Sequence, residues 1–170
     1  MSCLCSIALF KLDVNVQFES PMYFSKTVEY ALRAVVHLAQ NPGEPRKTSV
    51  IAESTQVPAA YLSKVLQSLR AGEIVEMQRG IGGGVTLARD PDELTILDVI
   101  NAVEPIQRIT TCPLSLKSHG TNLCALHKRM DKVIEATESA FQSTTLSELL
   151  ADPNPSVPLR ESKSKKRSKK

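Results

Sequence analysis

Cysteine and histidine side chains gather in one stretch of the chain that otherwise has little regular pattern. Thiolate sulfur and imidazole nitrogen both bind iron and zinc, and mixed cysteine and histidine ligation of two-iron clusters is established chemistry. The side chains of this stretch that suit a metal site are those of Cys112, His119, Cys124 and His127. Two cysteines and two histidines also satisfy a tetrahedral zinc ion, so the residue types leave zinc and a two-iron cluster open. Side chains without any ligand role are the alternative.

A second group of polar side chains lies on one face of a helix predicted to start at Pro58 and to end at Ala71-Gly72. Its apolar stripe consists of Leu62, Val65, Leu66 and Leu69. The positions outside that stripe are Ala60, Tyr61, Ser63, Lys64, Gln67 and Arg70. Ser63 and Gln67 can hydrogen-bond base edges, and Ala60 can touch a thymine methyl group. Tyr61 and Lys64 suit phosphate or guanine, so this face is typical of a helix that reads the major groove.

A short helix and a tight turn precede this face and complete a predicted helix-turn-helix. Thr48 or Ser49 caps the short helix, which ends near Ser54, and residues 55–57 form the turn. The amides at the start of the short helix can bind a backbone phosphate, so we assign Thr48 and Ser49 to the predicted DNA-binding surface. A helical hairpin with a solvated polar face is the alternative interpretation of these two helices.

A β-hairpin is predicted directly after the second helix of the motif. Residues 74–79 and 85–87 have an extended pattern, and the glycine-rich segment 80–84 permits the positive φ angles of a tight loop. Such a hairpin is the wing of a winged helix-turn-helix. We expect Arg79, beside Gly80 at its tip, to enter a narrow minor groove.

Helices with apolar stripes are predicted on both sides of this motif. One begins at Ser25 or Thr27 and stops at residues 41–43, and another begins at a capping box formed by Thr95 and Asp98. The aperiodic residues 108–122 form a long loop, which in a compact domain is usually functional or disordered. A further helix is predicted after the loop. Its core-facing positions alternate three and four residues apart, which is typical of helices that pack in pairs: Leu123, Leu126, Met130, Val133, Thr137 and Ala140. We interpret it as a dimerisation helix.

The predicted fold class is mainly α with a small β-hairpin, a winged helix-turn-helix domain plus a long C-terminal dimerisation helix. Residues 1–21 are an extension, either disordered or the product of a misassigned start. Residues 22–107 form the predicted DNA-binding domain, and residues 108–150 form a sensor loop and the dimerisation helix. Within the second range, a capping box at Thr145 and Glu148 starts one further short helix. Residues 151–170 form a disordered basic tail.

Length and charge restrict the classes of protein further. The 170 residues suit one domain with appendages, and no apolar run is long enough to span a bilayer or resembles a secretory signal, so we expect a cytoplasmic protein with no membrane partner. The formal net charge is +3, but six basic residues lie within 163–170, so the rest of the chain has a net charge of −3. Bulk charge therefore gives no evidence of DNA binding in the folded part, although the tail can add phosphate contacts.

Several of these elements resemble the Rrf2 family of bacterial transcription regulators. The matching stretches are Ser25–Ala34, Ile51–Glu53, Tyr61–Leu66, Arg79–Ala88 and Ile96–Ile100. The resemblance runs from about Met22 to about Leu150, and the wing with the helix after it is its most specific part. It implies a homodimer that binds palindromic operators in double-stranded DNA.

The resemblance also implies a cofactor. Several relatives hold an iron-sulfur cluster with three cysteines in this loop; Cys112 and Cys124 match the outer pair, whereas Ser118 stands at the middle position. Glu29 matches an acidic ligand that the first helix contributes in some relatives. The implied ligands of a [2Fe-2S] cluster are Cys112, Cys124, His127 and either His119 or Glu29. Zinc is one alternative, and a loop that has lost its metal is another.

We therefore expect a sequence-specific DNA-binding regulator, a repressor that senses redox state, nitric oxide or iron-sulfur status through a cluster. One alternative is the same regulator without metal, responding to a small ligand or a protein partner. Another is a metal or redox protein that does not bind DNA. An enzyme is not expected, because the sequence contains no phosphate loop, no credible carboxylate pair and no nucleophile with its base outside the cysteine and histidine loop.

Overall fold

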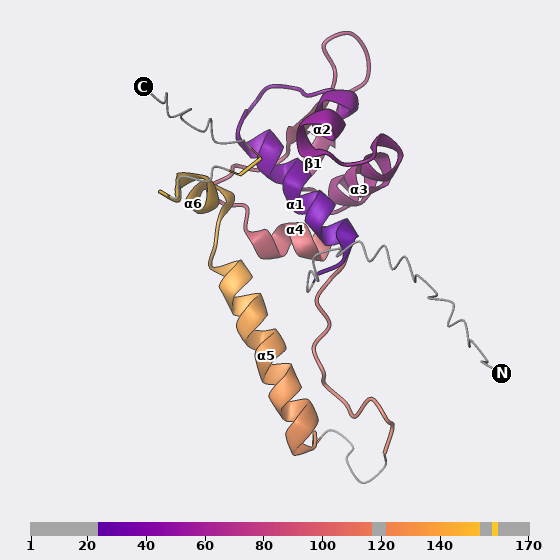
Figure 1. The fold of residues 1–170 in the computed structure, drawn as a ribbon, viewed down its shortest axis with the longest axis vertical. Coiled ribbons are helices and arrows are strands. Elements are labelled where there is room, and N and C mark those ends of the chain that lie inside the picture. Colours follow the sequence, from indigo (N-terminus) through magenta and orange to yellow (C-terminus); the bar gives the residue numbers. More distant parts are fainter. Residues whose placement is uncertain (1–23, 117–121, 154–157, 160–170) are drawn as a thin grey trace, which may run out of the picture.

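The computed structural model describes residues 24–116, 122–153 and 158–159, which form six helices and one two-stranded sheet (Figure 1). Their order is α1 (Lys26–Ala39), α2 (Thr48–Thr55), α3 (Ala59–Ala71), β1 (Val75–Met77), β2 (Val85–Leu87), α4 (Ile96–Val103), α5 (Ala125–Gln142) and α6 (Leu146–Ala151). The predicted fold, mainly α with a small β-hairpin and a long C-terminal helix, is confirmed. The predicted extension, Ser118, His119 and the basic residues of the tail lie outside the described residues.

Helix α1 forms the centre of the core, because its apolar residues recur on one side of the helix. Ala31, Ala34 and Val35 have no exposed surface, and α1 contacts α2, α3, α4 and α6. The Ser25 side chain accepts a hydrogen bond from the Val28 amide, so it caps α1 as predicted. The same hydroxyl donates to Glu104 at the end of α4, which links the start of α1 to the end of α4.

The helix-turn-helix consists of α2 and α3, joined through Gln56 in the left-handed conformation with φ 55°. The four residues of the predicted stripe of α3 are all buried. Two local predictions were wrong. Thr48 is the first residue of α2 and not its cap, since Lys47 holds the cap position without a side-chain hydrogen bond. Pro58 is the cap residue of α3 and not part of its first turn.

The wing is shorter than predicted, because β1 covers only Val75–Met77 of the expected strand 74–79. Val75 pairs with Leu87 and Met77 with Val85 in an antiparallel register. The loop between α1 and α2 adds a third segment, in which the Arg46 amide donates to the Val85 carbonyl at 2.9 Å and the Val85 amide donates back at 2.8 Å. Strand β2 therefore pairs with β1 and also with the loop between α1 and α2, which attaches the wing to the helical domain.

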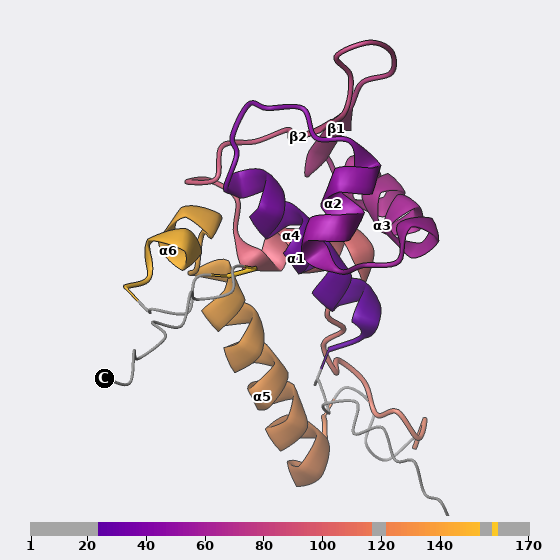
Figure 2. The same cartoon turned by 45° about the horizontal axis from the view of Figure 1, so that its top comes forward.

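Helix α5 projects from the domain that the other elements form (Figures 1 and 2). No residue of α5 is buried. The chain then returns through α6, whose Leu146 is fully buried and donates its amide to the Leu94 carbonyl at 2.9 Å. Both predicted capping boxes, at Thr95 with Asp98 and at Thr145 with Glu148, are present. No helix in the described part of the chain has the length and apolar character needed to cross a membrane.

Candidate nucleic-acid interface and cysteine-histidine loop

The predicted reading face of α3 is open to solvent. Its exposed residues are Ala60, Tyr61, Ser63, Lys64, Gln67 and Arg70. The Ser63 hydroxyl donates to the Ala59 carbonyl at 3.0 Å, so only its lone pairs are free for a base donor. Ser49 at the start of α2 is exposed and Thr48 is half-buried. The face has the side chains that base and phosphate contacts need.

Tyr61 also holds α3 against α1. Its hydroxyl lies 2.7 Å from the Thr27 hydroxyl, and its ring meets the Tyr30 ring edge to face with 5.4 Å between ring centroids. Arg33 lies 5.9 Å from the centre of the Tyr30 ring and donates to the Thr55 carbonyl at 3.3 Å. The start of α1 therefore positions α3. The spacing within α1 gave no signal of this contact, since it joins residues 34 positions apart.

We expect Tyr61→Phe to lower the free energy of unfolding by about 0.5–1.5 kcal/mol, because it removes the hydrogen bond to Thr27 and keeps the ring contact. Urea unfolding followed by circular dichroism measures the change. Ser63→Ala is the control, since its hydroxyl bonds only within α3, and we expect no loss there. An unchanged stability in Tyr61→Phe would mean that this hydroxyl does not support the fold.

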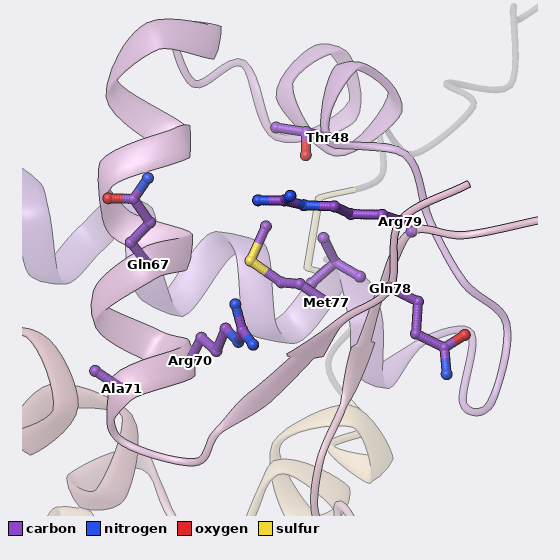
Figure 3. Close-up of a pocket in the computed structure, with 9 residues that line it drawn as sticks. Thr48, Gln67, Arg70, Ala71, Met77, Gln78 and Arg79 are labelled. Atoms are coloured by element: carbon purple, nitrogen blue, oxygen red, sulfur yellow. The ribbon is translucent and has the colours of Figure 1, made fainter.

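A cleft of about 460 Å³ lies between the C-terminal half of α3 and the wing; we call it the wing cleft. Its lining includes Thr48, Gln67, Arg70, Met77, Arg79 and Gly84. Figure 3 shows the Arg79 side chain directed from the wing across the cleft toward Thr48, and Arg70 pointing into the cleft from α3. Arg70 was not among the predicted contact residues.

Glycines fix the shape of the wing. A Cβ atom on Gly84 would lie 2.8 Å from the Arg46 carbonyl oxygen, so only glycine lets the wing approach the loop before α2 so closely. At the tip, the Gly83 amide donates to the Gly80 carbonyl at 3.1 Å, and Gly82 has φ +80°. The residue at the corner of this turn is Ile81, whose side chain is fully exposed. Arg79 lies before the turn, and Figure 3 shows its side chain directed into the wing cleft.

The cysteine and histidine residues come together only in part. Cys124 is the residue before α5, and its Sγ lies 3.4 Å from Nδ1 of His127, a separation compatible with two ligands of one metal ion. Cys112 is buried, and Glu29 forms an ion pair with Arg33. Among the residues that the structure describes, no three histidine, cysteine or acidic side chains are grouped so that they could hold a metal ion. The described residues therefore provide two ligands and do not fit a complete cluster site.

An arginine at the start of the loop ties it to α5. Nε and one terminal nitrogen of Arg108 donate to the two carboxylate oxygens of Asp131, each at 2.7 Å, and the Ile109 amide donates to the same carboxylate at 2.9 Å. Glu135 and Glu138, on the same face of α5, lie 3.4 Å and 3.3 Å from the guanidinium. The hydrogen bond from Arg108 lowers the pKa of Asp131 to about 2, and the hydrogen bond to Asp131 raises the pKa of Arg108.

The lowered pKa of Asp131 predicts an acid-dependent loss of stability. A carboxyl group whose pKa is lower in the folded state stabilises the fold fully above its unfolded pKa, near pH 4, and progressively less as the pH falls toward about 2. We expect the stability difference between the wild type and Asp131→Asn to be constant above about pH 4 and to shrink below it. Urea unfolding across this pH range measures it. Arg108→Gln removes the same contact and should remove the same pH step; a difference that does not vary with pH would contradict the assignment.

Helices α1, α2 and α3 form a core, the hairpin of β1 and β2 pairs with the loop before α2, and α3 exposes a polar face. This is the architecture of a winged helix-turn-helix DNA-binding protein. The model of the Rrf2 family, described as "Iron-dependent Transcriptional regulator", matches residues 24–152. The chain belongs to the Rrf2 family, which consists of transcription regulators and not of enzymes.

Individual relatives agree in fold and in class. A protein of Aquifex aeolicus (strain VF5) that is named an HTH-type transcriptional regulator is 31% identical to this chain over 132 residues. The match covers 76% of this chain and 92% of that protein. The structure of T. potens IscR is 29% identical, with a TM-score of 0.66, over 79% of this chain and 90% of the other. The structure of CymR, the global cysteine regulator of B. subtilis, is 26% identical, with a TM-score of 0.62, over 75% and 95% of the two chains.

Proposed function

We propose that this protein is a cytoplasmic repressor that binds palindromic operators in double-stranded DNA as a homodimer. The observation that carries the proposal is the exposed polar face of α3 beside the wing cleft. In this proposal α3 lies in the major groove, where Lys64 and Gln67 meet base edges. The start of α2 and the wing contact the backbone on either side. The basic residues of the tail add phosphate contacts that do not depend on sequence.

The dimer is proposed from the apolar face of α5. Leu126, Met130 and Val133 lie on one side of this helix and are 65%, 47% and 59% exposed. A helix with such a stripe and no buried residue does not bury enough apolar surface to be stable alone. The stripe is opposite the acidic face that Arg108 occupies, so a second copy can approach it without disturbing the loop. Two copies of the same stripe can bury each other across a two-fold axis.

In this arrangement, the dimer sets the distance between the two copies of α3. Half-sites of an operator lie about 34 Å apart, or a multiple of that distance, so a change in the tilt of α5 changes the fit to DNA. The loop of residues 108–124 connects α4 to α5, and Arg108 fastens its start to the helix. We infer that the signal enters through this loop and reaches the DNA through the position of α5.

The nature of the signal divides into two candidates. Iron-sulfur or zinc binding is favoured by the pair formed by Cys124 and His127, which are the two neighbouring ligands in the described part of the chain. The further ligands that we propose for a metal are Cys112 and either His119 or Glu29. A small ligand or a protein partner is the candidate that needs no metal. Anaerobic purification with iron, sulfide and zinc analysis separates the two: metal that is lost in Cys124→Ala supports the first, and metal-free protein that still binds DNA supports the second.

DNA reading is tested with Gln67→Ala. We expect a loss of about 1–3 kcal/mol of discrimination at one symmetric pair of operator positions, because a base contact is removed. Fluorescence anisotropy with the operator and single-base variants measures it. Gln142→Ala at the exposed end of α5 is the matched control and should change nothing. If the wild type prefers no DNA sequence, the proposal fails, and a metal or redox protein that does not bind DNA becomes the better account.

A further inference from the structure

We propose that Arg70 and Arg79 together bind one phosphate group in the wing cleft, from opposite walls. The inference rests on the proposed function and assigns a site within it. Arg70 comes from the last turns of α3 and Arg79 from the wing, and both line the same space of about 460 Å³ (Figure 3). Two guanidinium groups that face one cavity are the arrangement by which proteins hold phosphate oxygens.

Neither arginine has an acidic partner in the described part of the chain. Among the described residues, no ion pair is formed by Arg70 or Arg79, whereas Arg33, Arg46, Arg89 and Arg108 each have an acidic partner. Glu73 and Glu76 line the neighbouring hollow with Arg70 but are not within ion-pair distance of it. Two unpaired cations at one cleft repel each other, so an anion between them is favoured.

The remaining lining suits a phosphate on a polymer. Thr48 provides a hydroxyl at the start of α2, where no side chain caps the first amides of the helix. Met77, whose side chain lies between the two arginines in Figure 3, provides an apolar surface that suits a sugar. Because Gly84 and Arg46 hold the wing close to the helical domain, the two arginines remain on facing walls.

A phosphate group can reach this cleft from two sources, a phosphodiester of the DNA backbone or free inorganic phosphate. We favour the phosphodiester of bound DNA, because the wing cleft lies beside the reading face of α3. Free phosphate would compete with it, so cellular phosphate compounds would weaken DNA binding more than chloride does at the same ionic strength.

The experiment measures the affinity of the full chain for its operator over a series of chloride concentrations, in the wild type, Arg70→Gln, Arg79→Gln and the double variant. We expect each single variant to bind about tenfold more weakly and to reduce the slope of log affinity against log salt by about one, with the sequence preference unchanged. Because both arginines hold one phosphate, the double variant should lose less than the sum of the two. Lys128→Gln on α5 is the matched control and should leave the slope unchanged.

A second arm replaces chloride with inorganic phosphate at equal ionic strength. Stronger competition by phosphate in the wild type, lost in Arg70→Gln, shows that the cleft also takes free phosphate; equal competition leaves the DNA backbone as the source. An unchanged salt slope in both single variants, with sequence-specific binding intact, overturns the cleft and leaves the proposed function standing. If the wild type binds no DNA, the proposed function fails. Phosphate that raises the melting temperature of the wild type and not of Arg70→Gln would then still support the cleft as a phosphate site, and no difference between the two proteins would overturn it.

Discussion

Val133→Asp is expected to convert the proposed dimer to a monomer and to weaken binding to a palindromic operator by about 10²–10⁴-fold. The reason is that Val133 lies within the exposed apolar stripe of α5, where the proposed interface would desolvate a carboxylate. Each monomer keeps its own reading helix, so binding to a half-site survives. What is lost is the high effective concentration of the second half-site contact.

Sedimentation velocity and fluorescence anisotropy with whole and half operators measure the two parts of this result. Ser139→Asp is the matched control, because it puts the same charge at an exposed position on a different side of α5. It should remain dimeric and bind normally. A Val133→Asp protein that is still dimeric, or a monomer that binds the palindrome as tightly as the wild type, would show that α5 does not supply the operative interface.

Leu146→Ala is expected to lower the free energy of unfolding by about 2–5 kcal/mol, a large part of the stability of a domain of this size. Leu146 is fully buried, and it is the point at which the chain returns from α5 to the core. Its amide donates to the Leu94 carbonyl, and the Ile96 amide donates to the Thr144 carbonyl at 3.1 Å. The substitution leaves a cavity beneath α6 and loosens the attachment of α5 to the DNA-binding domain.

Denaturant unfolding at a fixed protein concentration measures this loss, since dimerisation also stabilises the fold. Leu114→Ala removes the same atoms at a position that is 70% exposed and should change stability by about 0.5 kcal/mol or less. Equal effects of the two substitutions would mean that α6 is not part of the core.

The features that sequence predicted correctly are those that depend on neighbouring residues. The capping boxes at Thr95 and Thr145 join positions only three apart, and their hydrogen bonds form wherever the helix begins. The buried stripe of α3 follows the helical period of about 3.6 residues, so the same pattern also predicts which side of α3 is exposed. Glycine at positions 80 and 82 indicated the tip of the wing, because their positive φ angles favour that residue.

The features that sequence did not predict depend on contacts between distant residues. Arg108 and Asp131 are 23 positions apart, and their ion pair depends on how the loop lies along α5. The direction of Arg79 depends on where the wing lies beside α3, and the bridge between Arg46 and Val85 joins the wing to the distant loop before α2. The surroundings of Cys112 and Glu29, which the family resemblance assigns to a metal site, also depend on the fold. Glu29 is paired with Arg33, and Cys112 is buried, with no group of three possible metal ligands around it among the described residues.

The central claim, that two copies of this chain read one palindrome, is tested most directly by selecting binding sites from random duplex DNA and weighing the complex by native mass spectrometry. We predict an enriched palindrome whose half-sites are centred about 34 Å, or a multiple of it, apart, with two chains on each duplex. Selection that enriches no common sequence, or one that enriches an asymmetric site bound by a single chain, would contradict the account.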